Sequence, residues 1–350
     1  MTPPPVTMLS LATAVPPHIL RQSAVADFAR RVYAKPFARF PKLADVFLNA
    51  GIEQRHSVCP IEWFDQPHDW SERTQCYLDG ASALFVAAAQ KALDRAGIAA
   101  RDVDTIITVS STGIATPSLE ARAMAQVGFK ASVSRVPVFG LGCAGGVSGL
   151  SLAARLARAE PGKVVLVVVV ELCTLAFRSD HGDKADVIST ALFGDGAAAA
   201  VLRAGGDSDG LRIGHGAEHT WPHTLDIMGW SVDPAGFGVV LKRSLPRFVE
   251  QRFAAPARRF IKAAKLAAPR FICHPGGAKV LDAIEGAMAL QKGTLRDERE
   301  VLRGYGNMSA PSVLFVLDHA LKRGLLGPAV LAALGPGFTA SFLALEAANG

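Results

Sequence analysis

Val164-Val165-Leu166-Val167-Val168-Val169-Val170 is an unbroken apolar run, and no apolar run in the chain is longer. Seven residues are far too few to cross a bilayer, which takes about 20 apolar residues in a helix. Because six of the seven are β-branched, the run predicts a strand, and its unbroken apolar character predicts burial of both strand faces. Strands of this kind are typical of sheets that helices cover on both sides.

Strand and helix patterns alternate on both sides of this run. Residues 103–110, 135–139 and 196–202 are predicted strands, and residues 119–127 have the apolar spacing of a helix. Another helix is predicted from Cys143 onward. This alternation predicts an α/β fold with mostly parallel sheets.

A second series of patterns repeats the first. It consists of a strand at 270–273, a helix from Ala278, a turn at 305–307 that opens another helix, and strands at 329–334 and 338–345. Gly142-Cys143 and Gly306-Asn307 then occupy the same point in each series, a turn that opens a helix. The sequence therefore predicts two pseudo-equivalent halves, residues 1–210 and 211–350, with a site between them.

Composition narrows the class of protein. Of the 350 residues 50% are hydrophobic and 19% are charged, which suits a large buried core and not a disordered chain. The five cysteines form no C-x-x-C motif and no cluster has zinc-ligand spacing, so we expect reduced thiols and no metal. The first residues lack the basic start and apolar stretch of a signal peptide, so we expect a cytoplasmic protein without stable membrane insertion.

The net charge of +6 comes from dispersed basic residues and gives no specific sign of nucleic-acid binding. A mild positive excess also suits an enzyme whose substrates carry phosphates and carboxylates. One loose basic stretch stands out, formed by Arg30, Arg31, Lys35, Arg39 and Lys42. A solvated helix face and a contact with such a ligand both remain open for it.

Cys143 lies in the glycine-rich turn GLGCAGG, residues 140–146, between a predicted strand and a predicted helix. The start of a helix presents unpaired N–H groups and the positive end of its dipole, and both stabilise a thiolate. Glycines on either side let a substrate carbonyl approach the backbone closely. A free cysteine is often just a small buried hydrophobe, but this turn favours a nucleophile.

Two polar residues of the second half fit partner roles. His274 ends a short apolar strand and precedes Pro275-Gly276-Gly277, where it can act as a base or stabilise an enolate oxygen. A structural histidine is the alternative. Asn307 stands just before a predicted helix, where its side chain can cap that helix. Alternatively, its amide can donate to a developing oxyanion.

Together, these positions resemble the condensing enzymes of the thiolase superfamily, and most closely the type III polyketide synthases, the chalcone synthase-like family. Four segments carry the resemblance: GCAGG (142–146), LFGDGAAA (192–199), HPGG (274–277) and YGNMSA (305–310). The segment GPGF (335–338) is similar to the C-terminal glycine loop of the family. The resemblance implies a thiolase-like fold of αβαβα layers in two pseudo-equivalent halves, and a homodimer.

The resemblance implies chemistry without a cofactor or a metal, with acyl-CoA and malonyl-CoA as substrates. Cys143 would take the acyl group, while His274 and Asn307 would hold the thioester carbonyl of malonyl-CoA as carbon dioxide leaves. The resulting enolate would attack the acyl group on Cys143, and repetition would build a chain that closes to a pyrone or an aromatic ring. Cys143, His274 and Asn307 are therefore the expected catalytic residues.

The resemblance also implies a set of cavity residues. Phe193 matches a family phenylalanine between the coenzyme A tunnel and the cavity, and Val239 stands where a second phenylalanine is expected, with Phe237 close by. Ser111 and Thr116 fall in a cavity-lining segment, and Thr116 would reach across the dimer interface. The full expected set is Ser111, Thr116, Cys173, Phe193, Gly194, Val239, Gly335, Gly337 and Phe338. For Cys173, simple packing is an equal alternative.

A valine in place of a phenylalanine widens the entrance, and the short Thr116 side chain leaves room in the cavity. Both features favour a medium or long fatty acyl starter over a planar one. The segment 111–117 is similar to that of bacterial alkylpyrone and alkylresorcinol synthases. We therefore expect a pyrone or resorcinol-type product.

Three alternatives remain open. A ketoacyl synthase III-like enzyme shares the Cys, His and Asn roles but performs one extension, and the HPGG turn and the GPG loop speak against it. A catalytically silent subunit of a heterodimer has no need of all three polar residues. A Cys/His/Asn hydrolase requires water at the acyl-enzyme, whereas the resembled family keeps the site at the end of a narrow tunnel.

Overall fold

The computed structural model describes residues 4–178, 182–205 and 210–347. The strands of the first half are β1 (Val6–Ala14), β2 (His18–Arg21), β3 (Gln54–Ser57), β4 (Thr105–Val109), β5 (Ser134–Val138), β6 (Val164–Leu172) and β7 (Asp195–Ala204). Those of the second half are β8 (Leu211–Thr220), β9 (Met228–Asp233), β10 (Gly236–Leu241), β11 (Arg270–Cys273), β12 (Gly327–Gly335) and β13 (Thr339–Ala347).

The α-helices follow the same division. In the first half they are α1 (Gln22–Val32), α2 (Ala34–Arg39), α3 (Asp45–Asn49), α4 (Trp70–Ala96), α5 (Leu119–Val127), α6 (Gly145–Ala159) and α7 (Lys184–Leu192). In the second half they are α8 (Leu245–Arg252), α9 (Ala254–Ala263), α10 (Ala278–Met288), α11 (Arg296–Tyr305) and α12 (Ser312–Lys322). Among the described residues, no helix is both long enough and apolar enough to cross a membrane.

The same strand pattern occurs twice in the main sheet, whose order is β11-β12-β13-β8-β1-β7-β6-β4-β5. In the first half, β4 and β6 are parallel, and β6, β7 and β1 follow in antiparallel pairs. In the second half, β11 and β12 are parallel, and β12, β13 and β8 follow in antiparallel pairs. The two halves join where β1 pairs with β8, so the expectation of two pseudo-equivalent halves is confirmed.

The expectation of mostly parallel sheets is wrong. Five of the eight strand pairs in the main sheet are antiparallel, namely β1–β7, β1–β8, β6–β7, β8–β13 and β12–β13. A parallel pair needs a crossover of a dozen or more residues. Between Gly335 and Thr339 the chain has room only for a tight turn, which makes β12 and β13 antiparallel.

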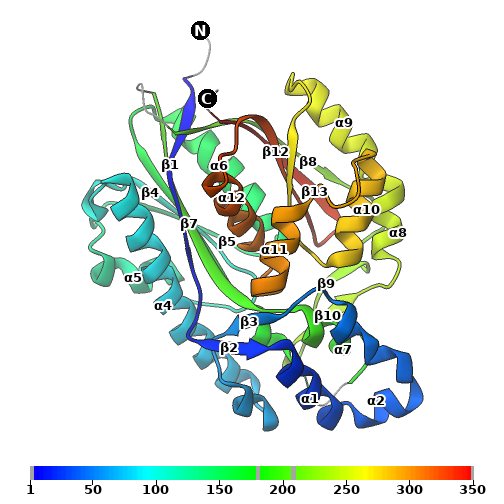
Figure 1. Cartoon of the computed structure of the whole chain (residues 1–350). Helices are drawn as coiled ribbons and strands as arrows, with labels where there is room; N and C mark the ends of the chain where they lie inside the picture. The colour runs from blue at the N-terminus through cyan, green and yellow to red at the C-terminus, as the bar shows by residue number, and fades with distance from the viewer. Residues whose placement is uncertain (1–3, 179–181, 206–209, 348–350) are drawn as a thin grey trace.

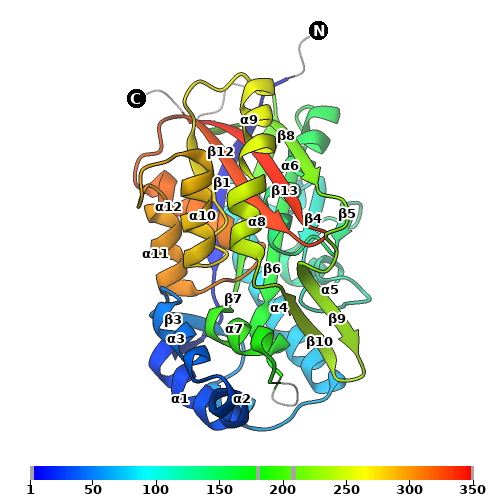
Figure 2. The ribbon, with the colours of Figure 1, turned by 90° about the vertical axis from the view of Figure 1, so that its right-hand side faces the viewer.

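Alternate residues of β6 face different cores, as the valine-rich run predicts. Val165 and Val167 pack into a central core with residues of α6 and α12, whereas Leu166 and Val168 pack into an outer core with α4. On the other side, Val330 and Ala332 of β12 pack against α8, α9 and α10. Figure 1 shows the resulting αβαβα layers, with α6 and α12 in the middle, and Figure 2 shows α8 and α10 in front of β12 and β13.

One end of the layers carries the smaller elements. The β2–β3 and β9–β10 pairs, α1, α2 and α7 gather there, at the lower end of Figure 1 and Figure 2. Contacts join α7 to α1, α3 and β10. Because α7 and β3 come from the first half and β10 from the second, this end brings the two halves together beyond the sheet.

Candidate active site

A cavity of about 660 Å³ contains the three expected catalytic residues. Cys143 reaches it from the first half, and His274 and Asn307 reach it from the second. All three side chains are buried. Because they come from turns far apart in the sequence, the junction of the two halves is what brings them onto one cavity.

Cys143 lies in a short 3₁₀ turn, Gly142–Ala144, directly before α6. The Ser111 hydroxyl oxygen accepts hydrogen bonds from the N–H groups of Gly140 and Gly142, both at 3.2 Å. Gly142 has a φ of +47°, and a Cβ there would lie 2.7 Å from the Cδ of Pro336. The glycine is therefore required both by its backbone conformation and by the close approach of the loop 335–337.

Burial dominates the electrostatics of the thiol. It raises the pKa of Cys143 to about 11, and the neighbouring Glu171 adds to that rise. The hydroxyl of Ser309, which donates to Cys143 Sγ at 3.5 Å, works in the opposite direction. The stabilising effect expected from the helix start is thus opposed by burial, and the thiol needs a nearby base to become a nucleophile.

His274 lines the same cavity and carries an imidazole that could take this proton. Its backbone is fixed by hydrogen bonds from its own N–H to Ala332 O at 2.8 Å and from Gly276 N–H to its carbonyl at 3.0 Å. Both ring nitrogens are buried and find no hydrogen-bond partner within the described part of the chain. Burial lowers the pKa of His274 to about 3, so its imidazole is neutral. A neutral ring can accept a proton on one nitrogen and donate from the other.

Asn307 does not cap a helix, because α12 begins five residues later, at Ser312. Its side-chain oxygen accepts the N–H of Ser309 at 2.8 Å, and its Nδ2 donates to Gly276 O at 3.3 Å. These two contacts fix which end of the amide is the donor. Since an amide nitrogen carries two N–H groups, the second remains available to a ligand in the cavity.

Three expected cavity residues do line the cavity: Cys173, Phe193 and Val239. The Phe193 ring meets Trp230 edge-on, with ring centroids 6.2 Å apart. Val239 pairs with Trp230 across the β9–β10 hairpin. Phe237 instead packs against Trp70, with centroids 5.1 Å apart, so valine rather than phenylalanine faces the cavity from β10.

The other expected cavity residues lie elsewhere. Ser111 does not line the cavity. Its hydroxyl instead binds the backbone of the turn that carries Cys143. A Cβ on Gly335 would come within 2.6 Å of Ala144 Cβ, and one on Gly194 within 2.4 Å of Tyr305 O, so both glycines permit close backbone packing. Thr116 is exposed on the surface, and its reach across a dimer interface stays a prediction.

Two expected cavity residues of the C-terminal glycine loop, Gly337 and Phe338, do not line the cavity. Phe338 is fully buried against Trp221 and Phe248, with ring centroids 5.5 and 4.8 Å away. Gly337, with a φ of +72°, lies in the same turn. Pro336, between Gly335 and Gly337, is the loop residue that lines the cavity.

Sequence reasoning also missed Ser309, Met228 and Trp230, all of which line the cavity. Ser309 lies within the quoted segment 305–310, which was the available signal, but Met228 and Trp230 follow no motif. Basic residues line the cavity as well, namely Lys42, Lys242, Arg243 and Lys279. Of the loose basic stretch, only Lys42 belongs to this group.

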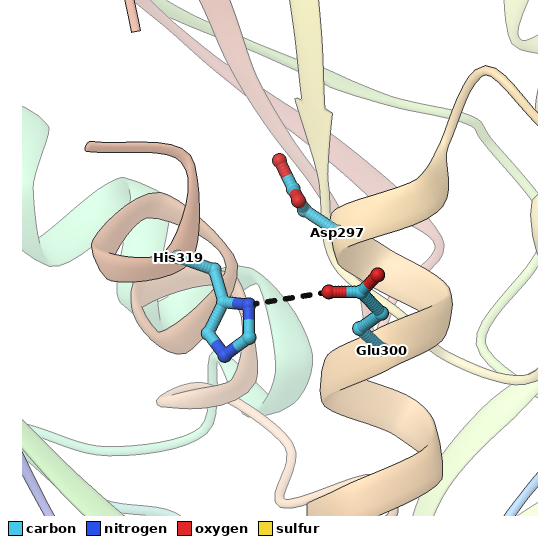
Figure 3. A group of neighbouring side chains, drawn as sticks. All are labelled: Asp297, Glu300 and His319. Atoms are coloured by element: carbon cyan, nitrogen blue, oxygen red, sulfur yellow. Dashed lines mark ion pairs between the residues drawn. The ribbon is translucent and has the colours of Figure 1, made fainter. Parts of the chain in front are cut away.

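A separate polar group lies on α11 and α12 (Figure 3), and none of its three residues lines the cavity. Asp297, Glu300 and His319 bring their ligand atoms within 4.8 Å of one another. Arg270 pairs with Asp297, and Arg323 pairs with Asp297 at 3.3 Å and with Glu300 at 3.0 Å. Because guanidinium groups already neutralise these carboxylates, the cluster reads as an ion-pair network.

The layered fold and the Cys/His/Asn cavity define an acyltransferase with a thiolase-like fold. Residues 2–206 match the family described as "Chalcone and stilbene synthases, N-terminal domain", and residues 214–347 match the corresponding C-terminal domain. The chain therefore belongs to the chalcone and stilbene synthase family, the type III polyketide synthases. These enzymes form carbon–carbon bonds by Claisen condensation of malonyl-CoA units.

Individual relatives agree with this assignment. The chain is 37% identical to the 1,3,6,8-tetrahydroxynaphthalene synthase of Streptomyces peucetius subsp. caesius, over 97% of this chain and 93% of that protein. It is 29% identical to the phloroglucinol synthase of Pseudomonas fluorescens, over 93% and 94% of the two chains. The crystal structure of the Streptomyces coelicolor 1,3,6,8-tetrahydroxynaphthalene synthase superposes with a TM-score of 0.93 at 29% identity, over 98% and 100% of the two chains.

The activation of Cys143 can be measured directly. Replacing His274 by alanine removes the imidazole that could take the thiol proton, so we expect the rate of Cys143 alkylation by iodoacetamide at pH 7 to fall at least about tenfold. Peptide mapping assigns the label, and a Cys143→Ala chain gives the background. His319→Ala serves as the matched control and should leave the rate unchanged. An unaltered rate in His274→Ala would show that another group activates the thiol.

Proposed function

We propose that this chain loads an acyl starter onto Cys143 and extends it with several malonyl units by decarboxylative condensation. The observation that carries this proposal is the arrangement of Cys143, His274 and Asn307 on a single cavity. One extension only, as in a ketoacyl synthase III-like enzyme, is the alternative from the same superfamily. Membership of the type III polyketide synthases favours repeated extension.

In the loading step, neutral His274 takes the proton of the Cys143 thiol as the sulfur attacks the acyl-CoA carbonyl, and the coenzyme A thiol leaves. In the extension step, His274 and Asn307 donate hydrogen bonds to the thioester oxygen of malonyl-CoA. The bond between the methylene carbon and the carboxylate of malonyl-CoA then breaks. Its electron pair forms the enolate, and carbon dioxide departs. The enolate carbon attacks the acyl group on Cys143, which releases the thiolate. A single oxyanion donor typically contributes about 10²- to 10³-fold in rate.

We further propose a medium or long fatty acyl starter and a pyrone or resorcinol-type product. The cavity falls within the range of about 300–1,000 Å³ that suits small organic ligands, and its lining is mainly apolar, including Ile188, Leu192 and Met228. The basic residues that line it, among them Lys42 and Lys279, would attract the phosphates of coenzyme A. No cofactor or metal is required in this scheme.

The names of the relatives supply a second candidate product. Tetrahydroxynaphthalene and phloroglucinol are aromatic compounds with several hydroxyl groups. A hydroxylated aromatic compound without an alkyl tail is therefore the alternative to an alkylpyrone or alkylresorcinol for this chain. We also propose that the active form is a homodimer in which the exposed Thr116 lies at the interface.

Mass spectrometry of the products distinguishes these candidates. The chain is incubated with malonyl-CoA alone and with malonyl-CoA plus acetyl-, hexanoyl-, lauroyl-, palmitoyl- or benzoyl-CoA, beside a Cys143→Ala control. We expect pyrones or resorcinols that carry the fatty acyl tail and are absent in the control. A hydroxylated aromatic from malonyl-CoA alone would select the second candidate. Products with one added unit from every starter would contradict repeated extension.

The width of the entrance is tested by Val239→Phe. A phenyl ring on β10 would narrow the space beside Phe193 and Trp230, so we expect kcat/KM for the longest accepted acyl-CoA to fall at least about tenfold. The value for acetyl-CoA should change less than about threefold, because its short acyl group needs little room at the entrance. Val232→Phe, at an exposed position of the same hairpin, is the control. An equal loss for both starters would contradict a gating role of Val239.

A further inference from the structure

Arg55, on β3, is a buried cation that the chemistry above does not use. Its side chain is only 1% exposed. Burial lowers the pKa of Arg55 to about 9, and the negative charge of Asp195 partly opposes that effect, so the guanidinium is still charged at neutral pH. Burying a cation costs several kcal/mol unless acceptors surround it. The groups that accept hydrogen bonds from the Arg55 guanidinium therefore indicate its role in the structure.

Three of these acceptors are backbone carbonyls at the C-terminal end of α7. Nη1 donates to Thr190 O at 2.7 Å and to Phe193 O at 3.2 Å, and Nη2 donates to Ala191 O at 3.0 Å. The last carbonyls of a helix lack partners within the helix, and a cation there is favourable. Arg55 thus supplies, from another element, the cap that ends α7 and fixes the chain path into Phe193.

A side-chain acceptor holds the guanidinium in place. Nη2 of Arg55 also donates to Gln22 Oε1. The amide nitrogen of Gln22 in turn donates to Phe47 O at 3.1 Å and to Ala191 O at 3.2 Å. Gln22 and Arg55 therefore bind the same carbonyl of Ala191, and together they anchor the end of α7.

The segment that Arg55 anchors is the segment that holds Asn307. The N–H of Asn307 donates to Leu192 O at 2.8 Å, and the N–H of Gly194 donates to Asn307 O at 3.0 Å. Both backbone groups of Asn307 are thus fixed by residues 192–194, one on each side of Phe193. A shift of this segment would move the Asn307 amide with it.

The close packing of β3, residues 192–194 and residues 305–307 is evident at two glycines. A Cβ on Gly306 would lie 2.8 Å from Leu192 O and 3.4 Å from Arg55 Cβ. A Cβ on Gly194 would lie 2.4 Å from Tyr305 O and 3.1 Å from Arg55 Cβ. Because β3, residues 192–194 and residues 305–307 are in direct contact, a displacement at Arg55 is transmitted rather than absorbed.

We propose that Arg55 is a positioning residue for Asn307, acting through the backbone of residues 190–194. The inference rests on the proposed role of Asn307 as an oxyanion donor. Arg55 touches no substrate, and its effect on the reaction is to keep the Asn307 amide within reach of the malonyl thioester oxygen. A displacement of about 1 Å is enough to cost on the order of 10²-fold in rate.

The decarboxylation half-reaction isolates this effect. In a Cys143→Ala chain no acyl group is loaded, so the enolate formed when malonyl-CoA loses carbon dioxide takes a proton from solvent and leaves as acetyl-CoA. The kcat and KM of acetyl-CoA formation are measured in this background for Arg55→Lys, for Asn307→Ala and for both together. Lysine keeps the charge but cannot donate from two nitrogens to the carbonyls of Thr190, Ala191 and Phe193.

We expect Arg55→Lys to lower kcat at least about tenfold with KM within about twofold, and Asn307→Ala to lower it about 10²- to 10³-fold. The double variant should be slower than Asn307→Ala by no more than about twofold, because each change disables the same donor, the Asn307 amide. A purely structural role would make the two losses multiply. Multiplying losses, or an unchanged kcat in Arg55→Lys, would overturn the positioning role.

The controls separate the levels of the proposal. Arg158, which donates to the carbonyls of Ile213 and Gly214 at 2.7 Å, gives the matched variant Arg158→Lys, which should keep kcat. Gln22→Leu removes the side-chain anchor and should lower kcat in the same direction; it carries the test if Arg55→Lys does not unfold cooperatively. An unchanged kcat in Asn307→Ala would overturn the role of Asn307 itself, whereas a loss there without one in either anchor variant would overturn only the inference on Arg55.

Discussion

Two backbone hydrogen bonds between residues 192–194 and Asn307 are the constraint on which the site depends. They join the end of α7, in the first half, to the turn before α12, in the second. Asn307 and His274 belong to one half and Cys143 to the other, so neither half holds a complete site. Because Gly194 and Gly306 have no Cβ, the two backbones can approach closely enough for this junction to form.

Burial controls the protonation of Cys143 and His274 in the cavity. It raises the pKa of Cys143 and lowers that of His274, so both groups favour their neutral forms. In the proposed scheme, charge develops when a proton moves from Cys143 to His274, or when a substrate oxygen accepts hydrogen bonds from His274 and Asn307. In a site with few competing waters, such donors count for more than they would in bulk solvent. Within the described residues, the buried ring nitrogens of His274 have no hydrogen-bond partner, which favours a partner from a bound substrate.

Local patterns predicted those parts of the molecule that local chemistry decides. The bounds of α5 and β11 agree with the predicted segments 119–127 and 270–273, and the valine-rich run is a strand buried on both faces. Antiparallel pairing in the sheet, the start of α12 five residues after Asn307, and the anchoring of α7 by Arg55 depend on contacts between distant segments. No periodicity or spacing reveals such contacts, which is also why Trp230, Arg243 and Lys279 went unnoticed.

In the proposed scheme Cys143 holds the acyl group and Asn307 serves enolate formation, and trapping the enzyme in mid-reaction separates these two roles. The Asn307→Ala chain is mixed with an accepted acyl-CoA and malonyl-CoA and quenched with acid. The mass of the peptide that contains Cys143 is then measured by mass spectrometry. We expect Cys143 to carry the starter, accumulated and unextended, because loading is intact while enolate formation is slow. A bare Cys143 peptide, or normal extension of the starter in this variant, would contradict it.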